Sequence, residues 1–174
     1  ILLNRIGDLW WQQGQGSTAD GYTLYKSRMH SMYQGYKDAI PHDFRFHVSL
    51  LATCATSSVG YGICNEIQKA QRDFVAEVRA AGDTDVHDTC DLQDCALEGT
   101  GLHATDNAAG VGKMVERYVH HLKWLEGLEA NSACGPTITG VAQIDSSAVF
   151  RVTVLQNGGT GLQTPNVANI QGFE

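Results

Sequence analysis

The sequence predicts an α+β fold in which amphipathic helices in the first three quarters of the chain pack on a C-terminal antiparallel β-hairpin or small sheet. Two long stretches before residue 130 carry apolar residues at spacings of three and four, which is the helical period. Two shorter stretches near the C-terminus are rich in β-branched residues. The predicted helices come first along the chain and the hairpin comes last. This order is typical of an α+β domain, in which helices and strands are segregated.

Length and charge indicate how many domains the chain forms and which partners are not expected. A chain of 174 residues is expected to form one domain over residues 1–174. The net charge is −7 and the 12 Lys and Arg are scattered singly, so we expect no nucleic-acid partner. No apolar run reaches about 18 residues, so we expect no membrane span in this chain. The first residue is Ile1 rather than Met, which indicates a trimmed N-terminus from which a signal or a membrane anchor could have been removed.

Residues 1–13 predict a short helix, because Leu2, Ile6 and Leu9 step by four and three. The adjacent Trp10 and Trp11 cannot both point squarely into one core, so one of them is expected to be exposed or to contact a partner. The alternative is that a following loop covers both. Residues 14–21, rich in Gly and Ser, predict a loop.

Residues 22–39 predict the next helix, which Pro41 ends because the residue before a proline avoids the α region. Tyrosines and methionines form its stripe: Tyr22, Tyr25, Met29, Met32, Tyr33 and Tyr36. Such a row of aromatic side chains could bind a carbohydrate. We favour the interpretation that the row lies at the edge of the core, where Tyr buries its ring and keeps its hydroxyl in water.

Residues 44–50 predict a strand, because Phe44, Phe46, Val48 and Leu50 alternate with polar residues. The alternative is that residues 49–56 start a helix. The neighbouring His42, Asp43 and His47 resemble a catalytic or metal-binding group. On a strand, however, Asp43 and His47 share one face and His42 lies on the other, and the sequence supplies no third ligand.

Residues 63–81 predict a strongly amphipathic helix, with Gly82 just after its last apolar residue as the C-cap. The acidic stretch that follows suggests a calcium loop, because closely spaced carboxylates repel unless a hard cation relieves them. Its candidate ligands are Asp83, Asp85, His87, Asp91 and Asp94. Asp88 occupies the position where such a loop needs glycine, and a solvated acidic loop is the alternative.

The cysteines favour a disulfide-containing protein of an extracellular or periplasmic compartment. Four of the five lie in loop-like or helix-end positions. Local bridges Cys54–Cys64 and Cys90–Cys95 are allowed, and so are crossed pairings. Cys134 is left over, so it is expected to be free, paired in another arrangement, or bonded to a partner chain. Buried free thiols in a cytosolic protein are the alternative.

Residues 111–128 predict the second secure helix, with Asp106 as its N-cap. His120 and His121 are adjacent and point about 100° apart on a helix, so a solvated or core-edge role is favoured over metal binding. Residues 137–144 and 148–156 are rich in β-branched residues, and the second stretch also alternates as a strand does. With Asp145, Ser146 and Ser147 as a tight connection, the two stretches predict an antiparallel hairpin.

Two classes of function remain. The first is an extracytoplasmic, disulfide-containing binding or assembly subunit without catalytic activity, which self-associates or binds a protein partner through residues such as Trp10, Trp11 and Cys134. The second is a secreted hydrolase or metal-dependent enzyme that uses His and Asp groups around residues 42–47 and 83–94. No local catalytic motif decides between them, because paired catalytic groups often come from distant positions.

Overall fold

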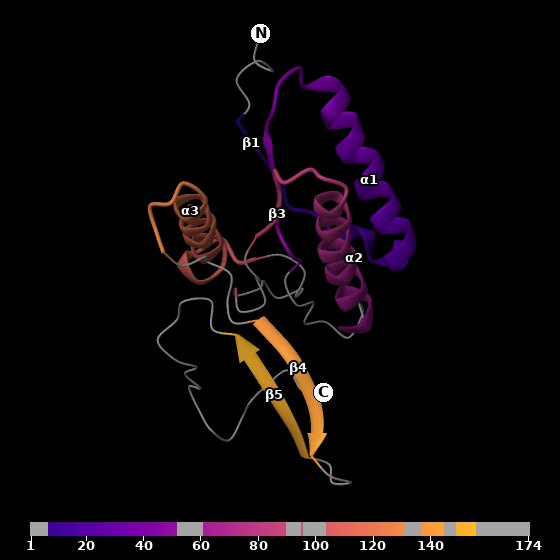
Figure 1. Ribbon diagram of the computed structural model, residues 1–174, viewed down its shortest axis with the longest axis vertical. Coiled ribbons are helices and arrows are strands. Elements are labelled where there is room, and N and C mark those ends of the chain that lie inside the picture. The colour runs from indigo at the N-terminus through magenta and orange to yellow at the C-terminus, as the bar shows by residue number, and fades with distance from the viewer. Residues whose placement is uncertain are drawn as a thin grey trace.

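The computed structural model describes residues 7–51, 61–89, 95, 104–130, 137–144 and 149–155. Helices and strands are mixed, and the predicted α+β class is confirmed. Figure 1 shows the long helices α1 (Gly21–Ala39) and α2 (Tyr61–Ala80) beside a small sheet, with α3 (Lys113–Leu125) on its other side. The C-terminal strands β4 (Thr137–Ile144) and β5 (Val149–Leu155) form the predicted antiparallel hairpin.

A three-stranded parallel sheet lies at the centre of the molecule. The predicted strand at residues 44–50 is confirmed as its middle strand, whereas the other two strands and the parallel pairing were not predicted. Its strands are β1 (Asp8–Trp11), β2 (Arg45–Val48) and β3 (Val86–Asp88), in that order across the sheet. Helix α1 connects the first two strands and α2 connects the second to the third. Parallel strands need such crossover connections, and this is why helices and strands alternate along the first half of the chain.

The register of this sheet aligns three aromatic or imidazole side chains in one row. Trp10 of β1 is opposite His47 of β2, and His47 is opposite His87 of β3. Because successive side chains of a strand point to opposite faces, this row shares one face of the sheet. The sheet therefore has two chemically different faces.

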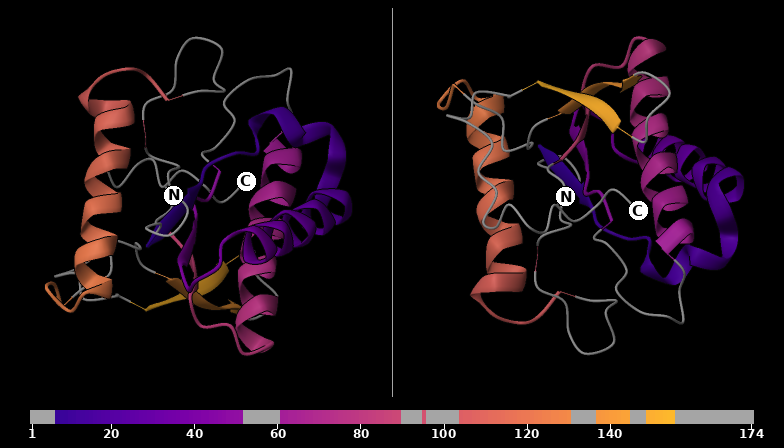
Figure 2. Two further views of the ribbon diagram at one scale, coloured as in Figure 1. Left: turned by 90° about the horizontal axis from the view of Figure 1, so that it is seen from above. Right: turned by 90° about the horizontal axis from the view of Figure 1, so that it is seen from below.

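The apolar face is covered by α1 and α2. Phe46, Val48 and Val86 of the sheet are fully buried there, and Leu9 and Trp11 of β1 pack against the same core. The helices contribute Tyr25, Met29, Tyr33, Ile67, Ala70, Phe74, Val75 and Val78. The two views in Figure 2 show α1 and α2 on one side of the strands and α3 on the other. The parallel sheet is thus the middle layer between two layers of helix.

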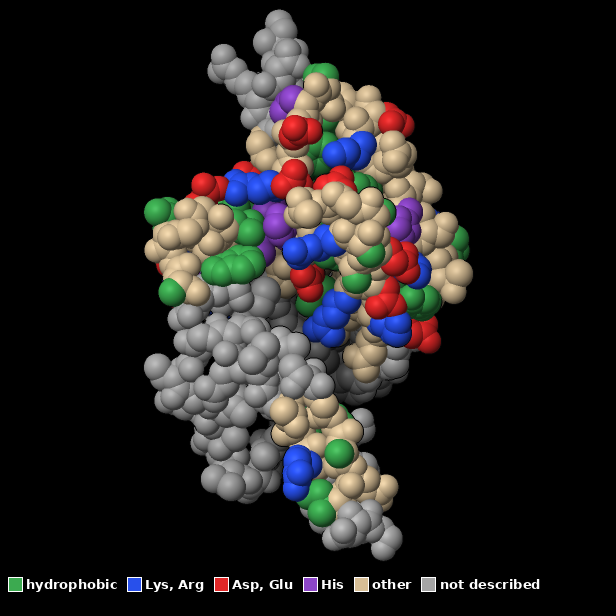
Figure 3. All heavy atoms as spheres, viewed as in Figure 1, with side chains coloured by type: hydrophobic (Ala, Val, Ile, Leu, Met, Phe, Trp, Pro, Cys, Tyr) green, Lys and Arg blue, Asp and Glu red, His purple; other side chains and the backbone are tan. Residues whose placement is uncertain are grey.

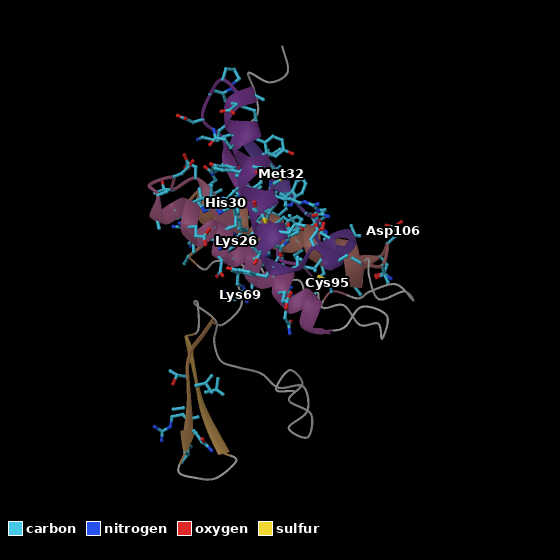
Figure 4. The ribbon with its side chains drawn as sticks, turned by 90° about the vertical axis from the view of Figure 1, so that its right-hand side faces the viewer. Lys26, His30, Met32, Lys69, Cys95 and Asp106 are labelled. Carbon is cyan, nitrogen blue, oxygen red and sulfur yellow. The ribbon has the colours of Figure 1, made fainter. Side chains whose placement is uncertain are left out.

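The helices predicted at residues 22–39 and 63–81 are confirmed to within about two residues at each end, as is usual for helix boundaries. The tyrosine stripe of α1 faces the core, with Tyr25 and Tyr33 buried. On the outer side, Lys26 and His30 of α1 contact Glu77 of α2. Figure 4 labels Lys26 and His30 where α1 and α2 overlap in the view.

Two local predictions were wrong. Within residues 7–13 the chain forms strand β1 rather than a helix, because pairing with β2 and the β-propensity of Trp outweigh a short helical spacing. The N-cap before α3 is Asn107 rather than Asp106: its side-chain oxygen accepts hydrogen bonds from the amides of Ala109 and Gly110. These amides open a π-helical turn, η3 (Ala108–Gly112), which leads directly into α3.

The disulfide prediction lies largely outside the described residues. Cys54, Cys90 and Cys134 are among the residues not described, and nothing is said of the side chain of Cys64. Cys95 is buried beside Met114 of α3. Within the described part of the chain, no helix has the length and apolar character needed to span a bilayer.

Candidate functional site

Three histidines from three elements meet on the face of the parallel sheet that α3 covers. His47 of β2, His87 of β3 and His121 of α3 form what we call the histidine cluster. The ring centroids of His47 and His87 are 5.5 Å apart, those of His47 and His121 are 5.4 Å apart, and those of His87 and His121 are 6.0 Å apart. His47 and His121 are fully buried, and His87 is half-buried.

Aromatic side chains form the walls of the cluster. Trp10 stacks on His47 with centroids 4.3 Å apart and lies 4.5 Å from the ring of Tyr118. Trp124 of α3 lies 5.8 Å from His121. The hydroxyl of Tyr118 accepts a hydrogen bond from Ser49 at 2.7 Å, which ties α3 to the end of β2. The imidazoles are therefore held in a mostly apolar, aromatic environment.

A carboxylate from β1 orients His47. The Nε2 atom of His47 lies 2.8 Å from Oδ1 of Asp8. An ionised carboxylate has no proton to donate, so Asp8 is the acceptor of this hydrogen bond. His47 therefore donates from Nε2 and carries its lone pair on Nδ1. That Nδ1 atom is buried and has no hydrogen-bond partner among the described residues. An oriented imidazole with an unused lone pair can act as a base or as a metal ligand.

Arg45 links the carboxylate to α3. Its Nε and Nη2 atoms donate to the two carboxylate oxygens of Asp8, at 2.7 and 3.1 Å, and its Nη1 donates to Glu126 just after α3. Burial raises the pKa of Asp8, but the hydrogen bonds from Arg45 and His47 outweigh it and the net shift is downward. Asp8 therefore stays ionised beside His47, and Arg45 holds the end of α3 over the cluster.

Burial lowers the pKa of all three histidines, which favours the neutral imidazole in each. Burial lowers the pKa of His47, and this effect exceeds the opposing hydrogen bond to Asp8. Burial, followed by the nearby charge of His47, lowers the pKa of His87. The pKa of His121 falls to about 4, first through burial and then through the other two histidines. Neutral imidazoles keep their lone pairs, which both catalysis and metal binding require.

His121 is the most unusual member of the cluster. Both of its ring nitrogens are buried without a hydrogen-bond partner among the described residues. Leaving a buried polar atom unpaired costs about 1–3 kcal/mol, so each such atom calls for an explanation. The sequence pattern had favoured a solvated or core-edge role for this residue.

The acidic stretch that suggested a calcium loop does not gather in one place within the described residues. Asp83 accepts a hydrogen bond from Tyr33 at 2.6 Å and pairs with Lys37 at 3.2 Å, both on α1. Asp85 is exposed. His87 faces α3, on the side of the sheet opposite to the α1 helix that Asp83 contacts. Asp91 and Asp94 lie outside the described residues, so calcium binding stays a prediction.

The remaining predicted site residues are also placed. His42 is half-buried and Asp43 is exposed in the turn before β2, and the carboxylate that contacts His47 is Asp8 rather than Asp43. Trp10 and Trp11 are both half-buried, one against His47 and the other against the apolar core. Their predicted role in binding a partner stays a prediction, as does that of Cys134, which lies outside the described residues.

Sequence reasoning missed Asp8, Arg45 and His121 as site residues. A signal for Arg45 was present: Arg45 and His47 alternate with Phe46 and Val48, which places these two polar side chains on one face of the predicted strand. No comparable alternation marks residues 8–11 or the helix that carries His121. Figure 3 shows histidine side chains at the surface between α3 and the rest of the fold, so solvent reaches this side of the molecule.

Comparisons with known proteins leave the site to be interpreted from its own geometry. The chain matched no protein-family model, no curated protein and no solved structure.

Proposed function

We propose that the protein is a hydrolase whose histidine cluster activates a water molecule for attack on an uncharged acyl bond, an ester being the simplest case. The single observation that carries this proposal is the Asp8–His47 pair. A carboxylate holds Nε2 of His47 at 2.8 Å, and the opposite nitrogen is buried with its lone pair unused. This is the arrangement by which proteins orient a catalytic or metal-binding imidazole.

The chemistry needs one activated water. The neutral lone pair either takes a proton from the water directly or binds a metal ion that acidifies it. The water oxygen then bonds to the carbonyl carbon, the bond between that carbon and the alcohol oxygen breaks, and the proton removed from water passes to the departing alcohol. The products are a carboxylic acid and an alcohol, and no oxidant or reductant is consumed.

The surroundings favour an uncharged substrate. Trp10, Tyr118 and Trp124 supply aromatic walls, and Asp8 and Glu126 supply negative charge. Arg45, the cation in contact with these carboxylates, is already paired with both. A phosphate ester would meet repulsion at such a site, whereas a carboxylic ester would not.

Hydrolysis of p-nitrophenyl acetate, followed by p-nitrophenolate absorbance, tests this function. We expect His47→Gln to lower kcat/KM at least tenfold and Asp8→Asn to lower it less, because the asparagine oxygen still accepts from Nε2. The matched control is His30→Gln, which changes an α1 histidine on the opposite side of the sheet. Equal rates for the His47 and His30 variants would refute the proposal, because the activity would then come from exposed imidazoles in general.

A second candidate is the assembly function, and an exposed apolar stripe on the outer side of α3 favours it. Val115 and Val119 are 52% and 44% exposed, and the exposed Val111 precedes them at the same spacing of four residues. In this role the domain would be an extracytoplasmic, disulfide-containing subunit that self-associates or binds a protein partner. Light scattering tests it: a larger particle that Val115→Glu reduces to a monomer would support assembly, and a monomer at all concentrations would oppose it.

A further inference from the structure

We propose that the histidine cluster is a zinc site in which His47, His87 and His121 each supply one nitrogen ligand. The inference deepens the hydrolase proposal and rests on it for the chemistry, but its evidence is separate. It concerns the spacing of the three rings and the unpaired nitrogens between them.

The spacing of the rings fits one shared ion. Zinc–nitrogen bonds of about 2.0–2.1 Å and tetrahedral angles place the centroids of two coordinated imidazoles roughly 5 Å apart. The three centroid distances here are 5.4, 5.5 and 6.0 Å. All three centroid distances are thus within about 1 Å of that separation. The rings of His47 and His87 are stacked at 21° to each other, so the His87 ring must turn before its lone pair points toward an ion shared with His47.

The unpaired nitrogens provide the ligand atoms. Nδ1 of His47 and both ring nitrogens of His121 are buried without a partner among the described residues. A bound ion is one of the few explanations for such atoms in a folded protein.

The surroundings of His47 match those of a zinc ligand. A histidine that binds zinc usually donates its other ring N–H to a carboxylate, which fixes the tautomer and the ring orientation. Asp8 is that carboxylate, and Arg45 holds it in turn with two hydrogen bonds. The half-buried His87 leaves the site open on one side for a water molecule as the fourth ligand. Three protein ligands and one water are typical of a catalytic rather than a structural zinc site.

Binding requires a small rearrangement of the rings. As the side chains stand, no three His, Cys, Asp or Glu of the described residues bring their donor atoms close enough to hold an ion. Rotation of the His121 ring breaks no hydrogen bond among the described residues, because neither of its nitrogens has one. His47 can keep its bond to Asp8, because its free Nδ1 is the ligand atom. The ion would pair two of the three unpaired buried atoms, Nδ1 of His47 and one nitrogen of His121, because an imidazole binds a metal through a single nitrogen.

The first test is titration of the metal-free protein with Co²⁺, which reports tetrahedral coordination through its visible absorption, and then with Zn²⁺. We expect one Co²⁺ per chain with the strong bands of a tetrahedral site, displaced by one equivalent of Zn²⁺. We also expect zinc at about 100 times its dissociation constant to raise Tm by on the order of 5 °C. Weak octahedral absorption, or binding without saturation at one equivalent, would overturn the site.

Two adjacent histidines of α3 supply matched variants. His121→Gln removes a proposed ligand, whereas His120→Gln changes a neighbour that pairs with Glu129 outside the cluster. We expect the first change to weaken zinc binding at least 100-fold and the second to change it less than threefold. Equal affinities of the two variants would overturn the assignment. His47→Asn serves as the second ligand variant, and far-UV circular dichroism confirms that each variant is folded.

The two proposals can fail separately. Tetrahedral zinc binding without ester hydrolysis would support the zinc site and overturn the hydrolase function. Ester hydrolysis that depends on His47 and is unchanged by EDTA, in a protein that binds no zinc, would overturn the zinc site and support direct proton transfer to His47.

Discussion

The two faces of the parallel sheet are built from the same three strands but have opposite chemistry. One face presents Phe46, Val48 and Val86 to α1 and α2, and these side chains are fully buried among apolar neighbours. The other presents the row Trp10–His47–His87 to α3, where imidazole nitrogens are buried without partners among the described residues. The first face stabilises the fold. The second departs from the rule that buried polar atoms are paired, and such departures concentrate at functional sites.

The largest expected loss of stability comes from a substitution on the apolar face of the sheet. Phe46→Ala removes a fully buried ring that contacts Tyr33, Tyr36 and Phe74. We expect it to lower the free energy of unfolding by about 3–5 kcal/mol, as measured by urea denaturation. Trp10→Ala, on the histidine face, should cost less because Trp10 is only half-buried. A larger loss for Trp10 than for Phe46 would reverse the roles assigned to the two faces.

The next largest effect is a loss of stability at low pH, which arises from the histidine cluster on the face of the sheet that α3 covers. The pKa of His121 is about 4 in the folded protein, against an ordinary value of 6.5. Between these values the unfolded chain binds a proton that the folded protein does not, so stability falls as the pH drops from about 6.5 to about 4. The loss should be roughly 3 kcal/mol at pH 4, measured by urea denaturation across this range. His121→Gln should remove most of it and His30→Gln should not; identical pH profiles for the two variants would contradict this assignment.

A smaller effect concerns how α3 begins. Asn107→Ala removes the side-chain acceptor for the amides of Ala109 and Gly110, and should lower stability by about 1 kcal/mol in thermal or urea unfolding. Asp106→Ala, at the exposed residue that the sequence had suggested as the cap, should change it far less. Equal losses at the two positions would mean that the described cap does not stabilise the helix.

The smallest expected effect is a gain in stability from a substitution in α1. Gly35 lies exposed within α1, and a Cβ added there would meet no atom within 4 Å. Gly35→Ala should therefore raise the free energy of unfolding by about 0.5–1 kcal/mol, through the helix propensity of Ala. Gly82→Ala is the contrasting change, because Gly82 has a φ of +103° that Ala tolerates poorly. Stabilisation by the Gly82 change would contradict the conformation described after α2.

The sequence by itself determined α1, α2, α3 and the β4–β5 hairpin. Each is long enough for its apolar residues to repeat with a clear period, and Pro41 and Gly82 mark the ends of two helices. These signals are local, so they survive without knowledge of the rest of the fold. The α+β class follows from their order along the chain.

Only the tertiary structure decided the parallel sheet and the site that it carries. The alternation over residues 44–50 predicted β2, but β1 and β3, with four and three residues, are too short for a period to show. Their pairing joins segments that whole helices separate, and it placed Asp8 rather than the nearby Asp43 beside His47. It also brought His121 from α3 to two histidines of the sheet. Contacts of this kind depend on packing between distant elements, and no local pattern of residues encodes them.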